Sequence, residues 1–136
     1  MITVVLSWSG SLKERFDESR EEIQDFVSDM HSRGFEVGLV AEESREEVED
    51  KLDADYAVGN VEDLSEVLSS LLSRYDKVFF VTDVEAELAT ANASGAFTVG
   101  VTSVSTDADD LGGVGPNYIV DSYAEFEKIL KLERMD

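Results

Sequence analysis

The sequence predicts a doubly wound α/β fold, in which helices cover both faces of one parallel sheet. The spacing of apolar residues switches several times between two and about 3.6, which indicates alternating strands and helices. The connections are mostly short, and parallel strands need right-handed crossovers of the kind that helices supply. A chain of 136 residues with 43% hydrophobic residues is long enough for one sizeable core. We therefore expect residues 1–136 to form a single domain.

The N-terminal half contains three predicted strands. Residues 2–6 form an apolar run typical of a strand that is buried on both faces. A capping box at residues 19–22 begins a helix that ends at Gly34. Residues 35–40 form the second strand. A second capping box at residues 44–47 begins another helix, and residues 55–58 form a short third strand.

The C-terminal half continues the alternation. Leucines and valines from Leu64 to Leu72 mark a helix, and residues 77–81 are the most strand-like run in the chain. A helix follows at residues 84–94 and stops at Gly95. The remaining elements are strands at 97–101 and 118–120 and a last helix that begins with a capping box at residues 122–125. Together these elements predict a Rossmann-like three-layer sandwich.

Short motifs lie where the predicted strands end. The first strand is followed by Ser-Trp-Ser-Gly-Ser-Leu at residues 7–12, and the fourth by Thr-Asp-Val-Glu-Ala-Glu at residues 82–87. Residues 93–103 read Ala-Ser-Gly-Ala-Phe-Thr-Val-Gly-Val-Thr-Ser. In these segments the chain resembles the haloacid dehalogenase-like superfamily of phosphatases and phosphotransferases. The resemblance extends over nearly the whole chain and implies a strand order of three-two-one-four-five.

The same resemblance implies that the catalytic residues have been lost. The family opens with Asp-x-Asp-Gly-Thr-Leu, whose first Asp attacks phosphorus and whose second acts as general acid and base. Those two positions are Ser7 and Ser9 here, and the family's hydroxyl residue after the second strand falls on Ala41. A serine hydroxyl is a weak nucleophile without a neighbouring base. We therefore predict a catalytically degenerate protein that acts by binding or regulation, the alternative being a Mg²⁺-dependent hydrolase with altered catalytic residues.

The resemblance also marks candidate metal and ligand sites. Asp83 and Glu87 match carboxylates of the family, and two carboxylates could hold Mg²⁺ weakly with the help of water. Alternatively, Asp83 caps the following helix and Glu87 is solvated. The candidate ligand-binding residues follow the first and fifth strands: Ser7, Trp8, Ser9, Gly10, Ser11 and Thr102. Their hydroxyl and backbone N–H groups could contact an anion, or could satisfy only local backbone groups.

One predicted helix fills the space between Ser7 and Ala41, so we expect no inserted lid, or cap, at that point. In the family, capless members tend to act on large substrates, which suits an open crevice. The partner of such a crevice is a protein or a small-molecule ligand that the sequence does not identify.

The composition excludes several other functions. Thirty-one acidic residues against eleven basic ones give a formal net charge of −20, which repels nucleic acid and anionic membranes. The acidic residues alternate with apolar ones at helical spacing, which indicates a folded acidic shell such as proteins of salt-accumulating halophiles carry. We expect a halophilic archaeal source. The start of the sequence lacks the features of a signal peptide, and we expect a soluble, cytoplasmic protein.

Overall fold

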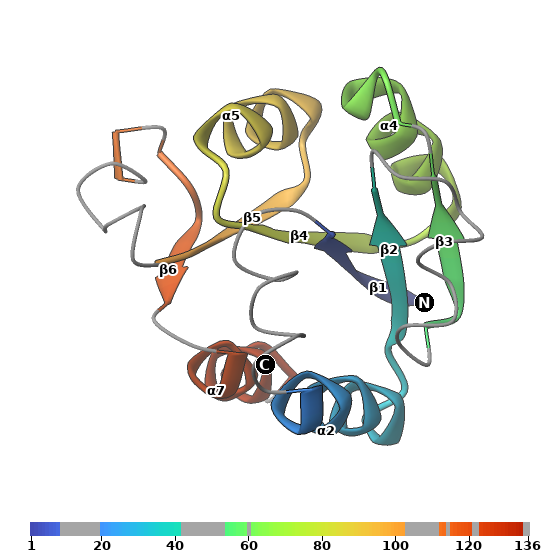
Figure 1. Cartoon of the computed structure of the whole chain (residues 1–136), viewed down its shortest axis with the longest axis vertical. Coiled ribbons are helices and arrows are strands. Elements are labelled where there is room, and N and C mark those ends of the chain that lie inside the picture. The colour runs from blue at the N-terminus through green and yellow to red at the C-terminus, as the bar shows by residue number, and fades with distance from the viewer. Residues whose placement is uncertain are drawn as a thin grey trace.

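The computed structural model has one six-stranded, all-parallel sheet with helices on both faces (Figure 1). It describes residues 1–8, 20–41, 54–59, 61–102, 112–113, 115–120 and 123–134. The strand order is β3-β2-β1-β4-β5-β6, which confirms the predicted doubly wound fold and adds β6 at the edge. The strands are β1 (Ile2–Ser7), β2 (Glu36–Val40), β3 (Tyr56–Val58), β4 (Lys77–Thr82), β5 (Phe97–Val101) and β6 (Tyr118–Val120).

The helices form the two outer layers of the sandwich. α4 (Leu64–Arg74) and α5 (Glu85–Ser94) cover one face of the sheet, and α2 (Arg20–Ser32) and α7 (Tyr123–Arg134) cover the other (Figure 1). The predicted glycine stops are confirmed, because Gly34 and Gly95 follow α2 and α5 with φ of 83° and 95°. Glycine adopts this left-handed conformation without the steric cost of a Cβ atom.

The period-two alternation along the strands divides the core into two layers. Val4 and Leu6 of β1 pack with the residues of α2 and α7, whereas Val5 packs with Leu68 and Leu71 of α4. Ser7 lies two residues after Val5 in β1, and Thr82 lies two residues after Phe80 in β4. Residues two apart in a strand point to the same face of the sheet. Ser7 and Thr82 therefore point to the face that α4 and α5 cover.

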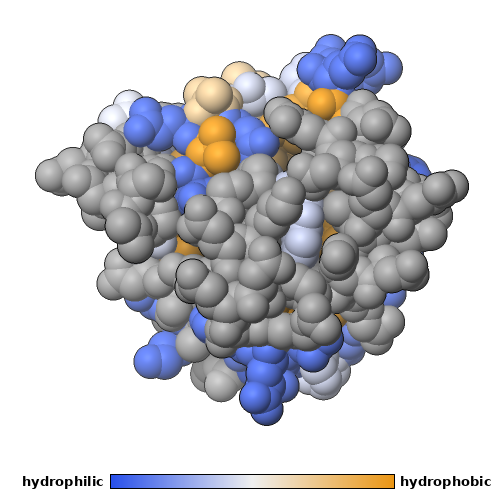
Figure 2. Space-filling model, viewed as in Figure 1, coloured by the Kyte–Doolittle hydropathy of each residue, from blue (hydrophilic) through white to orange (hydrophobic). Residues whose placement is uncertain are grey.

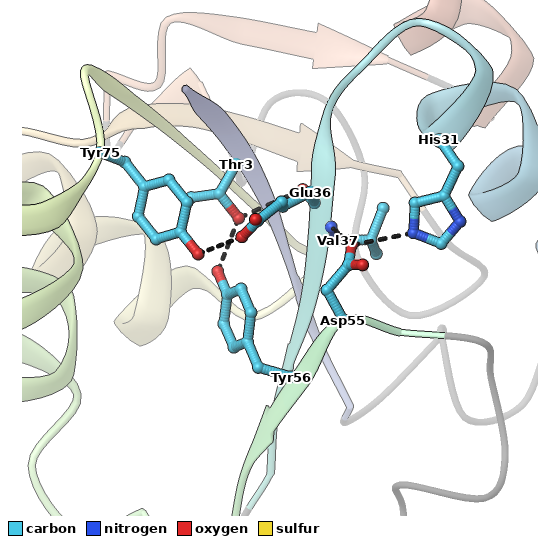
Figure 3. Close-up of polar contacts among 7 residues, drawn as sticks. All are labelled: Thr3, His31, Glu36, Val37, Asp55, Tyr56 and Tyr75. Carbon is cyan, nitrogen blue, oxygen red and sulfur yellow. Dashed lines mark hydrogen bonds and ion pairs between the residues drawn. The ribbon is translucent and has the colours of Figure 1, made fainter.

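A polar network holds the start of the strands on that same face (Figure 3). We define the amino-end cluster as Thr3, Glu36, Tyr56 and Tyr75. The hydroxyl oxygens of Thr3 and Tyr56 lie 2.6 Å apart, and the Tyr75 hydroxyl donates to the Glu36 carboxylate. Burial raises the pKa of Tyr56 to about 12. Burial, with the hydrogen bond to Glu36, also raises the pKa of Tyr75.

The Tyr56 ring fits over the sheet because β2 carries a glycine beneath it. Gly38 pairs with Tyr56 in the register of β2 and β3. A Cβ atom on Gly38 would lie 2.1 Å from Cε2 of the Tyr56 ring. Such a contact is far inside van der Waals distance, so this position excludes any larger residue while the ring stays in place. Beside it, Asp55 accepts hydrogen bonds from Val37 N at 2.7 Å and pairs with His31 Nε2 at 2.9 Å (Figure 3).

The outer strand β6 is attached to β5 by a side chain as well as by backbone pairing. Asn117 Oδ1 accepts from the backbone N–H of Thr98 at 2.9 Å, and Thr98 Oγ1 accepts from the backbone N–H of Asn117 at 2.9 Å. These bonds fix the residue just before β6 against the interior of β5.

The described helices are all too short or too polar to cross a membrane.

Candidate functional site

Ser7 ends the central strand β1, whose neighbours are β2 and β4. After β1 the chain forms β2 and β3 on one side of it, and then crosses to form β4 on its other side. In open α/β sheets, ligands bind beyond the carboxyl ends of the strands at this kind of reversal. The side chain of Ser7 is 3% exposed, so it forms part of the floor of this region.

Three side chains form a hydrogen-bonded group at this point, and we define them as the carboxyl-end cluster: Ser7, Thr82 and Glu87. Ser7 Oγ donates to Glu87 Oε1 at 2.6 Å, and Thr82 Oγ1 donates to the same oxygen at 2.7 Å. The cluster joins the ends of the neighbouring strands β1 and β4 to the first turn of α5. The hydroxyl of Ser7 is therefore a hydrogen-bond donor to a carboxylate.

The start of α5 explains why Glu87 reaches the strand ends. The N-cap of α5 is Val84, which has no side chain able to cap, and Thr82 Oγ1 instead accepts from the backbone N–H of Val84 at 3.1 Å. Asp83 therefore lies one residue before the N-cap position of α5. The expectation that Glu87 is solvated is wrong, since Glu87 is half-buried and accepts two hydroxyl hydrogen bonds.

The two candidate Mg²⁺ ligands come from different elements, since Asp83 directly follows β4 and Glu87 lies in the first turn of α5. Asp83 is buried, with 7% of its surface exposed. Glu87 lines a cavity between α4 and α5, which is described below, and Asp83 is not among its lining residues. Mg²⁺ prefers six oxygen ligands in octahedral geometry. In the ranges that the structure describes, no group of three or more His, Cys, Asp and Glu side chains could hold a metal ion.

A cavity of about 860 Å³ opens above the carboxyl-end cluster, between α4 and α5. Its floor contains Ser7, Trp8, Val40 and Ala41, and its walls come from the two helices and from the residues before α4. The surface over α5 shows hydrophobic residues beside hydrophilic ones (Figure 2). The wall residues are small or acidic: Glu62, Asp63, Ser65, Ser69, Ala86, Glu87, Thr90, Ala93 and Ser94, with Val61 and Leu64.

The structure gathers some of the predicted site residues and separates others. Ser7, Trp8, Ala41 and Glu87 line this cavity, although the Trp8 side chain is 3% exposed and packs in the core layer of α2 and α7. Thr102 does not line it; its backbone N–H donates to Val120 O at 2.9 Å beside β6. The predicted ligand contacts at residues 9–11 and the capping boxes at 19–22 and 44–47 lie partly or wholly outside the described residues.

Sequence reasoning missed the hydroxyl residues of the two helices. Ser65 and Ser69 of α4, and Thr90 and Ser94 of α5, all line the cavity. Each pair is spaced i, i+4, which places both members on the same side of a helix. That spacing is the signal that could have identified them, once the two helices are known to lie on the same face of the sheet.

No protein-family model and no curated protein matches the sequence. Solved structures do match. A haloacid dehalogenase-like hydrolase from Streptococcus pneumoniae has a TM-score of 0.67 and 15% identity, covering 81% of this chain and 59% of that one. A chain from Thermotoga maritima, provisionally called a β-phosphoglucomutase, has a TM-score of 0.70 and 15% identity, covering 96% and 99%. An archaeal β-phosphoglucomutase from Pyrococcus sp. strain ST 04 has a TM-score of 0.62 and 16% identity, covering 92% and 63%.

At these identities the similarity concerns the fold: the chain has the α/β fold of haloacid dehalogenase-like proteins. It spans 59% of the length of the S. pneumoniae protein and 63% of the Pyrococcus protein.

Proposed function

We propose that this chain is a non-hydrolytic binding domain built on a haloacid dehalogenase-like fold. The observation that supports this most directly is the residue at position 7, where a serine stands in place of the family's nucleophilic Asp. Its hydroxyl donates to Glu87 Oε1 at 2.6 Å, and the same oxygen accepts from Thr82. A hydrolase at this site would therefore have to use Glu87 as the base that activates Ser7.

The charge around the cavity supports the same proposal. Phosphoryl transfer requires positive charge, from Lys, Arg or a metal ion, on the oxygens of the transferred group. Among the described residues that line the cavity, three are acidic and none is basic. A phosphoryl anion would be repelled there, so the cavity suits a binding function better than phosphate hydrolysis.

The test is phosphatase activity toward a generic aryl phosphate with MgCl₂ in high salt. We expect no turnover from the wild-type protein, because serines replace both catalytic aspartates of the family at positions 7 and 9, and no described residue lining the cavity is basic. Turnover that Asp83→Asn abolishes would overturn the proposal and would support the Mg²⁺-dependent hydrolase instead. Asp25→Asn is the matched control, because it removes the same charge from the exposed side of α2 across the sheet.

A gain-of-ligand variant tests the alignment that underlies the proposal. Replacing both serines, Ser7→Asp and Ser9→Asp, should increase Mg²⁺ affinity, because carboxylates are the hard ligands that this ion prefers. Isothermal titration with MgCl₂ measures the change against the wild-type protein. If the double variant binds Mg²⁺ no more tightly than wild type, the correspondence between residues 7–12 and the family motif is wrong.

A further inference from the structure

The hydrogen-bond polarity of the cavity between α4 and α5 indicates what kind of ligand it can take. Four of the hydroxyl groups that line the cavity already donate hydrogen bonds to other groups of the protein. Ser7 donates to Glu87 and Ser65 to Asp63, at 2.6 and 3.0 Å. Thr90 Oγ1 donates to Ala86 O at 3.0 Å, and Ser94 Oγ donates to Thr90 O at 2.9 Å. A hydroxyl whose hydrogen is engaged in such a bond offers only its oxygen lone pairs to a ligand.

The acidic side chains of the cavity have the same polarity. Glu62 and Asp63 stand at the exposed rim before α4, and Glu87 lies half-buried nearer the floor. Ionised carboxylates are acceptors only. They also occupy the positive ends of the two helices, because Asp63 caps α4 and Glu87 lies in the first turn of α5. The two helix ends that could otherwise attract an anion are therefore already faced by carboxylates.

The described part of the lining thus presents mainly acceptors and negative charge. A phosphate or carboxylate ligand brings further acceptors and would meet like charge. A cation with N–H donors satisfies both features, since an ammonium group carries three donors and a positive charge. The acids extend from the rim to the floor, and within the described part of the chain they form no compact group that could hold a metal ion. An elongated organic cation matches this spread better than a single metal ion.

We propose that this cavity binds a small organic cation that carries more than one ammonium group, of the aliphatic diamine class. One ammonium group would lie at Glu87 above Ser7, and another at the rim near Glu62 and Asp63. A cavity of about 860 Å³ has ample room for such a molecule. This inference rests on the proposed binding function and names the ligand class of that same site.

The experiment compares three four-carbon probes that differ in charge. Isothermal titration measures binding of 1,4-diaminobutane, 1,4-butanediol and succinate to the whole chain in about 1 M KCl, where the Debye length of about 3 Å suppresses diffuse attraction to the acidic surface. We expect the diamine to bind with one-to-one stoichiometry, the diol to bind at least about tenfold more weakly, and succinate not to bind. Equal or tighter binding of the diol or of succinate overturns the proposal, as does failure of the diamine to bind.

Matched variants separate a site from general attraction to an acidic protein. Glu87→Gln keeps an oxygen that accepts from Ser7 and Thr82 but removes the charge, and Glu62→Gln removes an exposed charge at the rim. Each should weaken diamine binding about tenfold, because a charge-assisted hydrogen bond is lost. Asp25→Asn on α2 should leave it unchanged. If Asp25→Asn weakens binding as much as Glu87→Gln does, the diamine binds the surface in general and the proposal is overturned.

Two parallel measurements keep this proposal distinct from the proposed function. Titration with MgCl₂ alone asks whether a metal ion is the preferred cation, and Mg²⁺ binding that Glu87→Gln abolishes, without diamine binding, overturns the organic cation. Aryl phosphatase activity is measured on the same preparation. Absent diamine binding with absent turnover rejects only the ligand class, whereas turnover rejects the binding function itself.

Discussion

Two hydroxyl and carboxylate clusters lie on the same face of the sheet, at opposite ends of its strands, and the one at the carboxyl end borders the cavity between α4 and α5. At the amino end, Tyr56 and Tyr75 fill the space and reach Thr3 and Glu36 (Figure 3). At the carboxyl end, Ser7, Thr82 and Glu87 make similar hydrogen bonds, but their neighbours on α4 and α5 are serine, threonine and alanine. The volume of the surrounding side chains, more than the bonds themselves, separates a structural cluster from a candidate binding site.

The largest expected effect on stability comes from filling the space under Tyr56. Gly38→Ala places a Cβ atom about 2 Å from the Tyr56 ring, so the ring must move and the cluster must open. We expect the free energy of unfolding to fall by about 3 kcal/mol in urea denaturation. Adding Tyr56→Ala should recover part of that loss, because the clash is removed. A Gly38→Ala protein as stable as wild type would show that the ring is not held against the sheet.

Salt should stabilise the protein, because its acidic side chains repel one another, including those that line the cavity at the carboxyl end of the strands. Raising KCl from about 0.05 M to about 2 M should increase stability by about 2 kcal/mol, since like charges such as Glu21 and Asp25 at i, i+4 are screened. Thermal melting measures the effect. Glu62→Gln, which removes one exposed carboxylate at the cavity, should reduce this salt dependence more than Glu36→Gln, whose carboxylate accepts from Tyr75. A melting temperature that is flat across the salt range would contradict the halophilic interpretation of the acidic shell.

Alkaline pH should weaken the amino-end cluster. The pKa of Tyr56 is raised to about 12 and that of Tyr75 is raised as well, so both phenols ionise more readily in the unfolded chain. Their contribution to stability is therefore complete below about pH 10 and is lost as the pH rises toward about 12. Tyr75→Phe should cost about 1 kcal/mol at neutral pH and make the alkaline loss less steep. Urea denaturation at several pH values measures both effects, and an unchanged slope in Tyr75→Phe would contradict the assignment.

The smallest expected effect comes from removing one hydroxyl at each end. Ser7→Ala should cost only about 0.5 kcal/mol, because water in the cavity can replace the lost donor to Glu87. Thr3→Val should cost more, because Thr3 is fully buried and its hydroxyl contacts Tyr56. Chemical denaturation of the two variants gives the ratio directly. Equal costs would mean that the two ends do not differ in access to water.

The fold could be predicted because its signals are local. Apolar runs and the glycines at 34 and 95 each act within a few residues, and they place most of the described strands and helices within one or two residues of the structure. Strand order followed from the resemblance and is confirmed. These features do not require knowledge of which side chains meet across the sheet.

The candidate site could be predicted only in part, because its contacts are not local. The bond from Ser7 to Glu87 joins positions 80 residues apart and depends on which helices cover which face. Nothing in the sequence indicates that the Thr82 hydroxyl accepts from the backbone N–H of Val84, the N-cap residue of α5. The cavity itself arises where small residues of two helices face each other, which no single segment reveals.

The attachment of Asn117 to Thr98 bears on how this fold could change in evolution. Because Asn117 fixes the start of β6 through Thr98, the pairing of the outer strand is specified where the strand begins. The register of β6 then depends little on the length of the connection from β5. Each doubling of a flexible loop costs only about 0.6 kcal/mol in closure entropy. New sequence inserted between these two strands could therefore diversify the protein while the sheet keeps its register.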